Sequence, residues 1–421
     1  MNIYKFGGAS VKDAGAVKNV ISILKENNSK EKVVVISAMG KTTNELESVV
    51  DLYYAGKAEW DKALDGVYEK HLTIIMSLYD GNVNSKVVVD VKKLIESVRR
   101  FLNRNTSRNY NYIYDQVVSV GEYISTTVAS DYANSVGLKN TLLDVKEVLF
   151  TDNAYTEGKV DFEKTETAIK TKIADLIKTG FVITQGFVGS TPEGFFTTLG
   201  REGSDYTASI FAYSLDAERM TVWKDVEGIM NADPKEFPNT ELLSEITYHE
   251  AIEMTYYGAS VIHPKTIKPI QNKNIPLEVR SFVNYNKRGT IISANANVNF
   301  LPPLIIRKAD QILLSFSAKD FSFIAEEHLS KVFSTFAQNR LRINLMQNAA
   351  ISFSIAVDYI SEKVENVISE LQEDFSISRN DKLTLLTIRH YNQGIIDRMT
   401  RDKDILLRQV SRTTIQVLMR E

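Results

Sequence analysis

Short, continuous apolar runs alternate with stretches of helical periodicity over residues 1–292. The run Val33–Ile36 is typical, because it is β-branched and apolar throughout, like a strand buried on both faces of a sheet. Such alternation predicts a three-layer αβα sandwich. The predicted strands are Lys32–Ala38, Lys139–Val145, Gly180–Thr184, Phe195–Leu199, Met220–Trp223 and Pro276–Ser281. The predicted helices are Ala14–Glu26, Ser119–Val136, Asp161–Lys178, Ser204–Leu215 and Tyr248–Tyr257.

Two segments depart from this alternation. Residues 44–104 carry apolar residues at helical spacing, which predicts a helical insert. Residues 293–303 are poor in helix and strand formers and end in Pro302 and Pro303, which predicts a linker. We therefore expect one domain over 1–292 and a second region over 304–421.

The pattern beyond the linker is βαββαβ-like and predicts two small ferredoxin-like α+β units, one at about 310–378 and a shorter one at about 380–421. The shorter unit lacks one strand of the complete pattern. The predicted elements are Ile312–Ser317, Ile324–Asn339, Ile343–Met346, Ser352–Val357, Ser361–Leu371, Leu383–Arg389, Asn392–Arg401 and Thr413–Met419.

Composition narrows the function classes. The chain is 43% hydrophobic and 24% charged, as is usual for a globular protein, and its net charge of −3 argues against a nucleic-acid binder. It has no cysteine, which excludes disulfides and thiolate catalysis. The five histidines show no ligand spacing, so we expect no metal site built by the protein. A signal-peptide pattern and an apolar run long enough for a membrane span are both missing, so we expect a cytoplasmic protein.

Two glycine turns carry the candidate chemistry. In Thr197–Ala208, Gly200 and Gly203 let the backbone approach a ligand, the following helix start offers N–H groups to an anion, and an arginine offers two parallel hydrogen bonds. A similar strand–glycine turn occupies Ile3–Ser10. Two such turns suggest phosphoryl transfer to an acidic small molecule.

Five segments, in order, resemble the motifs of the aspartokinases. Lys5–Ser10 (KFGGAS) resembles the signature that opens these enzymes, and Thr198–Asp205 (TLGREGSD) resembles their TLGRGGSD turn. The other three are Gln185–Gly189, Asp225–Gly228 with Ala232–Lys235, and Tyr256–Pro264. The resemblance is close to about residue 290 and looser beyond, where the two ferredoxin-like units resemble paired ACT domains. In that family one ACT unit is inserted in the other, which implies that residues 304–309 supply the missing strand.

The resemblance implies ATP-dependent phosphorylation of the L-aspartate β-carboxylate to 4-phospho-L-aspartate, the first step toward lysine, threonine and methionine. ATP would bring Mg²⁺ bound mainly to its own oxygens. The paired ACT domains imply an amino-acid effector, lysine or threonine, and a homodimer or larger even oligomer, since their sheet edges invite pairing.

The same resemblance assigns roles to individual residues. Lys5 would contact the transferred phosphoryl group, and Asp205 would orient Lys5 or the metal-bound phosphates. Arg201 would hold the α-carboxylate of aspartate and Glu122 its α-ammonium, although Glu122 taken alone fits a solvated helix residue better. The remaining substrate contacts would be the hydroxyls of Thr43 and Ser204 and the ring of Phe187. The nucleotide contacts would be Lys5, Gly7, Gly8, Lys224, Asp225 and Lys235.

Effector binding is expected at the amides of Asn344, Gln347 and Asn348, which from the residues alone equally fit a polar turn. Several positions depart from the family, and two of them bear on catalysis. Glu202 replaces a glycine of the turn, and Ser260 replaces a lysine that contacts the nucleotide, for which Lys224 or Lys265 would compensate.

Two other functions stay open at this point. One is another amino-acid kinase, such as a glutamate 5-kinase, which the helical insert and the ACT pair argue against. The other is a non-catalytic ACT amino-acid sensor. Glu202 and Ser260 favour the sensor, and the intact Lys5, Arg201 and Asp205 oppose it. The segment His263-Pro264 is interpreted as a structural turn.

Overall fold

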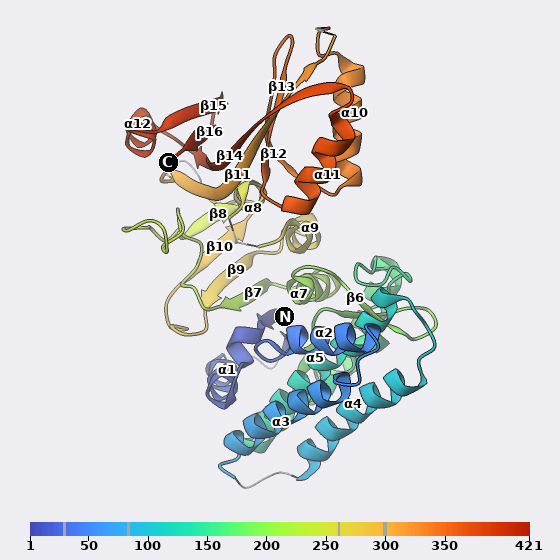
Figure 1. The fold of residues 1–421 in the computed structure, drawn as a ribbon. Helices are drawn as coiled ribbons and strands as arrows, with labels where there is room; N and C mark the ends of the chain where they lie inside the picture. The colour runs from blue at the N-terminus through green and yellow to red at the C-terminus, as the bar shows by residue number, and fades with distance from the viewer. Residues whose placement is uncertain (28–30, 82–84, 260–261, 298–300, 321) are drawn as a thin grey trace. The chain divides into compact units, whose positions relative to one another are not determined.

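A computed structural model describes residues 1–27, 31–81, 85–259, 262–297, 301–320 and 322–421 (Figure 1). The chain forms two compact units. The N-terminal unit comprises Met1–Ile229, Leu242–Ile252 and Ile262–Val298, and the C-terminal unit comprises Met230–Glu241, Glu253–Val261 and Asn299–Glu421. Two short segments from before the predicted linker therefore belong to the C-terminal unit.

The N-terminal unit is built on an eight-stranded sheet in the order β3-β4-β2-β1-β7-β9-β10-β8. The six strands from β3 to β9 pair in parallel, and β10 is antiparallel to β9. Strand β1 lies in the middle, and its Lys5 pairs with Val35 of β2 and Val222 of β7. The strands are β1 (Asn2–Phe6), β2 (Lys32–Ile36), β3 (Asn140–Leu143), β4 (Phe181–Gln185), β7 (Arg219–Lys224), β8 (Glu245–Thr247), β9 (Leu277–Ser281) and β10 (Thr290–Ser293).

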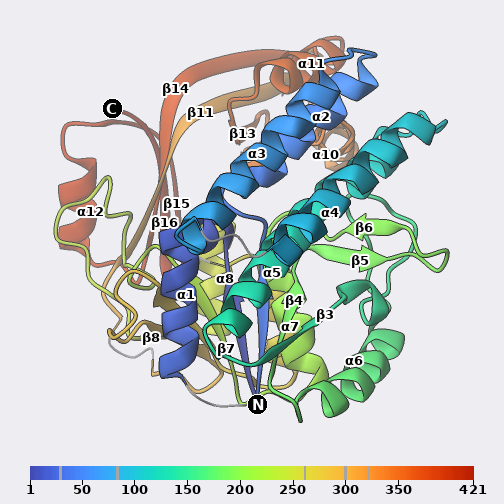
Figure 2. The same cartoon turned by 90° about the horizontal axis from the view of Figure 1, so that it is seen from below.

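Helices cover both faces of this sheet (Figure 2). Alternate residues such as Phe6, Ile36 and Ile183 form one core with α1 (Ala14–Glu26) and α5 (Tyr110–Ser135). The opposite face contacts α7 (Gly203–Ser214), which packs against α6 (Phe162–Leu176) and α9 (Pro264–Asn272). The predicted three-layer αβα class is confirmed.

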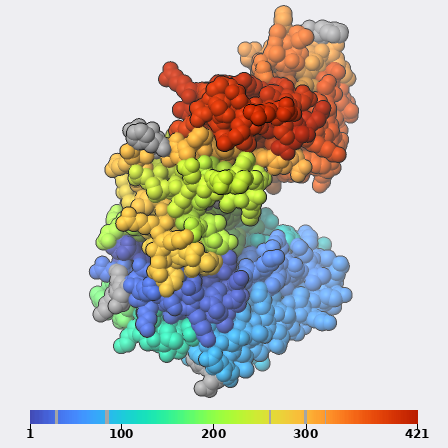
Figure 3. All heavy atoms as spheres, turned by 90° about the vertical axis from the view of Figure 1, so that its left-hand side faces the viewer, coloured from blue at the N-terminus to red at the C-terminus, as the bar shows by residue number. Residues whose placement is uncertain are grey.

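The helical insert adds α2 (Thr42–Tyr54), α3 (Trp60–Leu78) and α4 (Ser85–Arg104) to the α5 side. Their apolar faces belong to the same core as the sheet, so the insert extends that core. Residues of the insert gather on one surface of the unit, in blue in Figure 3. Smaller elements complete the unit: the 3₁₀ helices η1 (Gly8–Val11) and η2 (Val145–Glu147), the hairpin strands β5 (Val188–Ser190) and β6 (Phe196–Thr198), and α8 (Tyr248–Tyr257), whose last five residues belong to the C-terminal unit.

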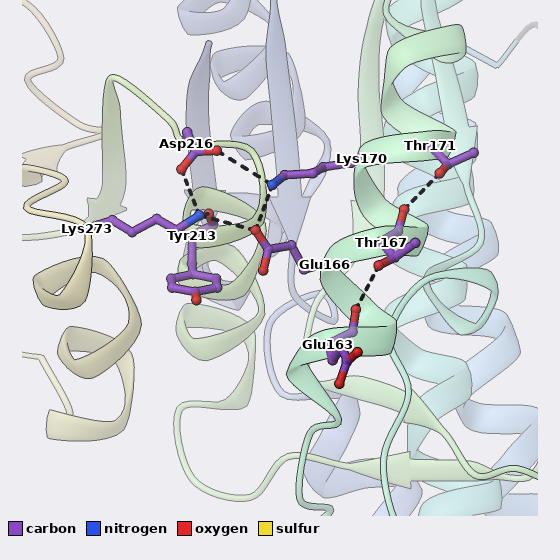
Figure 4. A network of polar contacts seen from close by, with 8 residues as sticks. All are labelled: Glu163, Glu166, Thr167, Lys170, Thr171, Tyr213, Asp216 and Lys273. Atoms are coloured by element: carbon purple, nitrogen blue, oxygen red, sulfur yellow. Dashed lines mark hydrogen bonds and ion pairs between the residues drawn. The ribbon is translucent and has the colours of Figure 1, made fainter.

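A polar network joins the helices on the α7 side of the sheet (Figure 4). Lys273 Nζ donates to Tyr213 O at 2.7 Å and to Asp216 Oδ1 at 2.7 Å, and it lies 4.1 Å from the centre of the Tyr213 ring. Glu166 of α6 pairs with Lys170 at 2.7 Å. The network lies at the C-terminal end of α7, at the opposite end of the helix from Ser204 and Asp205.

The C-terminal unit contains a six-stranded antiparallel sheet in the order β12-β13-β11-β14-β16-β15. Strands β11 and β14 run through both halves of it. The first half packs against α10 and α11, and the other half packs against α12. The elements are β11 (Leu304–Ala318), α10 (Glu326–Gln338), β12 (Ile343–Asn348), β13 (Phe353–Asp358), α11 (Ser361–Leu371), β14 (Phe375–Arg389), α12 (Gln393–Thr400), β15 (Asp404–Val410) and β16 (Thr414–Arg420).

Each half has the strand order of a ferredoxin-like unit. Residues Leu304–Lys308 pair with β14, from Leu304 opposite Arg389 to Lys308 opposite Leu385, and so supply the strand that the α12 half lacked. The sequence prediction missed β15, which pairs with β16 at the edge of the sheet. Ala232 and Phe237 pack into the core of the α12 half, which explains why their segment groups with this unit. None of the described helices is long and apolar enough to cross a membrane.

Candidate active site

A cavity of about 750 Å³ lies in the N-terminal unit where β1 and β7 end. Its wall is formed by residues that follow these strands, by the starts of α2 and α7, and by α5. The carboxyl ends of parallel strands are where α/β sheets bind ligands. The predicted residues that line it are Lys5, Gly7, Gly8, Thr43, Glu122, Phe187, Arg201, Ser204, Asp205, Lys224 and Asp225.

Lys5 and Asp205 form an ion pair at the base of this cavity. Lys5 Nζ lies 2.7 Å from Asp205 Oδ1, and the two side chains are only 12% and 4% exposed. The carboxylate holds the ammonium at the strand end. An ammonium has three donors, so the pair leaves donors available to a ligand.

The turn after β1 passes unusually close to the loop after β2. A Cβ added to Gly8 would lie 2.7 Å from Ala38 O and 2.9 Å from Gly40 O, so no other residue fits there without a backbone shift. The N–H of Gly40 donates to Gly8 O at 3.0 Å and closes the contact. The close approach at Gly8 places Gly7, Gly8 and Lys5 on one wall of the cavity.

Glu122 is buried on α5 with a 3% exposed side chain. Burial raises its pKa to about 8, and the N–H of Ala38, the charge of Lys5 and the N–H of Gly186 only partly oppose that shift. Its Oε2 has no hydrogen-bond partner in the described part of the chain. A cationic ligand beside this buried group would stabilise its ionised form.

Arg201 is exposed at the tip of the turn before α7, and among the described residues no carboxylate pairs with it. Ser204 and Asp205 follow in the first turn of α7, whose positive dipole end favours an anion. Phe187 lines the same cavity with a φ of +68°, a conformation that is strained for an aromatic residue. Its N–H donates to Thr207 Oγ1 at 3.0 Å, and its carbonyl accepts from Leu199 N at 2.9 Å.

The departure at Glu202 has a structural role. Glu202 adopts the left-handed conformation that the family glycine would take, with a φ of +53°. Its Oε2 accepts from His263 N at 3.0 Å, and His263 Nδ1 in turn accepts from Lys265 N at 3.1 Å at the start of α9. This carboxylate therefore ties the start of α7 to the start of α9 and removes one of the two observations that favoured a sensor.

The structure does not bring every predicted nucleotide contact to the cavity. Lys235 belongs to the C-terminal unit. Ser260 lies outside the described residues. Lys265 donates to Leu199 O at 2.9 Å and supports the backbone before Arg201. Of the two lysines expected to compensate for Ser260, only Lys224 lines the cavity.

Sequence reasoning missed several residues around the cavity. Thr156, Thr198, Tyr110 and Tyr114 also line it. The N–H groups of Thr156 and Thr198 each donate to the carboxylate of Asp115 at 2.9 Å. The signal was present, because Asp115 lies two helical turns before Glu122 on the same face of α5.

The predicted effector residues lie on β12 in the C-terminal unit, which forms an edge of the sheet. Asn344 Nδ2 donates to Gln311 Oε1 at 2.8 Å and to Asp358 Oδ1 at 2.9 Å, and its Oδ1 accepts from Lys308 Nζ at 2.9 Å. Gln347 and Asn348 are exposed. These residues form a strand and not the polar turn that was the alternative.

This chain is similar in sequence to known proteins. The family model for the amino acid kinase family matches residues 1–281. The chain belongs to the amino acid kinase family. Within it, the chain is 32% identical over 298 residues to bifunctional aspartokinase/homoserine dehydrogenase 2 of Arabidopsis thaliana, a match that covers 69% of this chain and 32% of the relative. The chain thus spans about a third of the length of that plant relative.

Two further likenesses in this family extend over most of the chain. Lysine-sensitive aspartokinase 3 of Escherichia coli (strain K12) is 29% identical over 359 residues, which cover 85% of this chain and 78% of the relative. The crystal structure of E. coli aspartokinase III in complex with lysine and aspartate matches with a TM-score of 0.83 and 25% identity, over 99% of this chain and 95% of that one. The resemblance to aspartokinases found in the motifs is confirmed.

Proposed function

We propose that this chain is an aspartokinase, which transfers the γ-phosphoryl group of ATP to the β-carboxylate of L-aspartate and yields ADP and 4-phospho-L-aspartate. One observation carries the proposal. A single cavity holds the Lys5–Asp205 pair together with Arg201 and the buried Glu122. These charges suit the α-carboxylate and α-ammonium of an amino acid and a phosphoryl group that is transferred to its side chain.

The substrate would be oriented by its two ends. Arg201 would hold the α-carboxylate through two parallel hydrogen bonds, and Glu122 would accept the α-ammonium. Thr43 and Ser204 would donate their hydroxyls, and Phe187 would close the side of the pocket. The β-carboxylate would then lie toward Lys5, in line with the phosphoryl group.

Lys5 would supply the catalytic charge. Both reactants are anions, so their repulsion must be cancelled as the phosphoryl group moves. A preorganised ammonium at the strand end stabilises the charge on the transferring oxygens, and Asp205 keeps it in place. The N-terminus of α7 places the positive end of its helix dipole near the same phosphoryl group.

The nucleotide would bind across Gly7, Gly8, Lys224 and Asp225. Mg²⁺ would enter with ATP and neutralise its phosphates. The described residues contain no group of three histidine or carboxylate side chains that could hold a metal ion. The ion would therefore depend mainly on nucleotide oxygens and water, as Mg²⁺ at phosphates usually does.

Regulation would reside in residues 304–421 as a pair of ACT domains. The E. coli relative is named lysine-sensitive, and lysine is the effector we propose for the region of Asn344, Gln347 and Asn348. Gln347 and Asn348 would offer exposed amides, whereas Asn344 would have to exchange its present partners. The sheet edges at β12 and β15 would pair with another copy of the chain and give a homodimer or larger even oligomer.

A coupled assay of ADP release tests the proposal. We expect ATP-dependent turnover with L-aspartate, little with L-glutamate, and inhibition by lysine. Turnover with glutamate in place of aspartate would favour a glutamate 5-kinase. Binding of lysine without ADP release from either substrate would favour the non-catalytic sensor.

A further inference from the structure

Asp115 is a buried carboxylate that neither the motifs nor the proposed reaction uses. It lies on α5 with a 0% exposed side chain. Its Oδ1 accepts from Thr198 Oγ1 at 2.7 Å, and its Oδ2 accepts from Thr198 N and Thr156 N, both at 2.9 Å. Asp115 itself does not line the cavity, but both threonines do.

The next residue continues the same contact. Gln116 Nε2 donates to Phe196 O at 2.9 Å, and Phe196 N donates to Gln116 Oε1 at 3.1 Å. Phe196 and Thr198 are the two ends of β6, which pairs with β5 along its other edge. The adjacent side chains of Asp115 and Gln116 therefore bind the edge of β6 that faces away from β5.

Strand β6 leads directly into the turn that carries Arg201. Only Leu199 and Gly200 separate Thr198 from it, so the position of Thr198 sets the start of the turn. Thr156 is held at a φ of +70°, which is strained for a β-branched residue. Strain of this kind persists only where the surroundings impose it, and the carboxylate of Asp115 is the group that binds the Thr156 N–H.

We propose that Asp115 is a positioning residue of the aspartate site, which fixes Thr198, Thr156 and, through β6, the Arg201 turn. The inference rests on the proposed function, since it concerns the substrate of that reaction. Asp115 touches neither substrate nor nucleotide and acts only through the cavity wall.

The choice of a carboxylate supports this role. Three donors converge on Asp115, and an ionised carboxylate accepts all of them with two oxygens. An amide of the same shape has a single acceptor oxygen and would turn N–H donors toward the N–H groups of Thr156 or Thr198. Among the described residues no lysine or arginine pairs with Asp115, and burial raises its pKa to about 6. The fold therefore keeps a buried charge at this point, where an apolar residue would leave three donors without an acceptor.

The test compares Asp115→Asn, Thr198→Val and the double variant in the aspartate-dependent ADP assay. We expect Asp115→Asn to raise the KM for aspartate by about tenfold, because the cavity wall loses the hydrogen bonds that hold it in place. The KM for ATP should change by less than about twofold. If Asp115 acts through Thr198, the double variant is no worse than Asp115→Asn alone. Independent, multiplying effects or an unchanged KM for aspartate would overturn the proposal.

Lys273→Met serves as the matched control, because it removes a polar network from the same unit without touching the cavity wall. It should lower the unfolding temperature and leave the KM for aspartate unchanged. If Asp115→Asn does not fold, Gln116→Leu tests the same support of β6 and must raise that KM. A wild-type protein that releases no ADP with aspartate refutes the proposed function, whereas an active wild type with an unchanged Asp115→Asn refutes only this inference.

Discussion

The polar residues of the cavity and those of β12 differ in how far the protein itself satisfies them. In the cavity, Glu122 Oε2 has no hydrogen-bond partner and Arg201 no ion-pair partner among the described residues, and Phe187 adopts a strained backbone. On β12, all three hydrogen bonds of Asn344 are made by neighbouring side chains. Unmet polar groups and strain cost stability and persist where a ligand completes them, whereas a satisfied network stabilises the fold.

The contrast separates two kinds of polar cluster that are alike in the sequence. Both sets contain residues that a family resemblance marks as functional. Only the first set surrounds a cavity at the ends of parallel strands. Substitutions in the cavity should therefore lower activity, and substitution of Asn344 should mainly lower stability.

Lys5→Ala should give the largest effect. It removes the charge at the transferring phosphoryl group, so kcat should fall by at least about 10²-fold in a protein that still folds. Lys41→Ala is a matched control, because Lys41 is exposed in the loop before α2 and is not among the residues that line the cavity. Near-normal turnover of Lys5→Ala would remove Lys5 from the mechanism and favour the sensor.

Arg201→Lys should have the next largest effect. The substitution keeps the charge but loses the two parallel hydrogen bonds. The KM for aspartate should rise by about tenfold and exceed any rise in the KM for ATP, as steady-state kinetics would show. Arg104→Lys, an exposed arginine of α4, should change neither. Equal rises in both constants for Arg201→Lys would place Arg201 at the phosphates.

Glu122→Gln should lower activity and raise stability together. The folded state holds the Glu122 proton up to a pKa of about 8, whereas the unfolded chain loses it near 4.5. Stability contributed by this group therefore falls as pH rises from 4.5 to 8 and is constant above 8. Glutamine avoids the penalty, so at pH 8 the variant should be more stable by up to about 4 kcal/mol. Thermal unfolding at pH 5 and pH 8 measures the difference, which should nearly vanish at pH 5.

The smallest effects concern β12. Asn344→Ala should reduce the free energy of unfolding by about 1–2 kcal/mol, because Lys308, Gln311 and Asp358 lose a shared partner. Gln347→Ala, at an exposed position of the same strand, should change it by less than about 0.5 kcal/mol but weaken inhibition by lysine. Chemical denaturation and lysine titration together check both. Equal loss of stability in the two variants would erase the contrast between the residues.

Most helices and strands followed from local pattern. Helices α1, α8 and α11 begin and end at the predicted residues, because apolar periodicity and flanking polar residues mark them clearly. Strand β15 was missed because it is a largely exposed edge strand whose apolar run, Ile405–Leu407, is short and flanked by polar residues. Helix α5 begins at Tyr110, nine residues before its predicted start, where the aromatic residues pack against the insert.

The cavity was predictable only where a motif names its residues. Lys5, Arg201 and Asp205 lie in glycine turns that have a recognisable chemistry. Asp115 and Thr198 are 83 residues apart, and nothing in either local pattern announces their hydrogen bond. The left-handed backbone of Thr156 and Phe187 depends on such distant contacts, so it too needed the structure.

Proton release on aspartate binding tests the central claim most directly. Glu122 has a pKa of about 8 in the free protein, so it is mostly protonated at pH 7 and must ionise to pair with the substrate ammonium. Calorimetry in two buffers of different ionisation enthalpy should therefore show proton release on aspartate binding at pH 7 and much less release at pH 9. Glu122→Gln should release none. Aspartate binding without proton release, or equal release by wild type and Glu122→Gln, would contradict the assignment of Glu122 and of the cavity as the aspartate site.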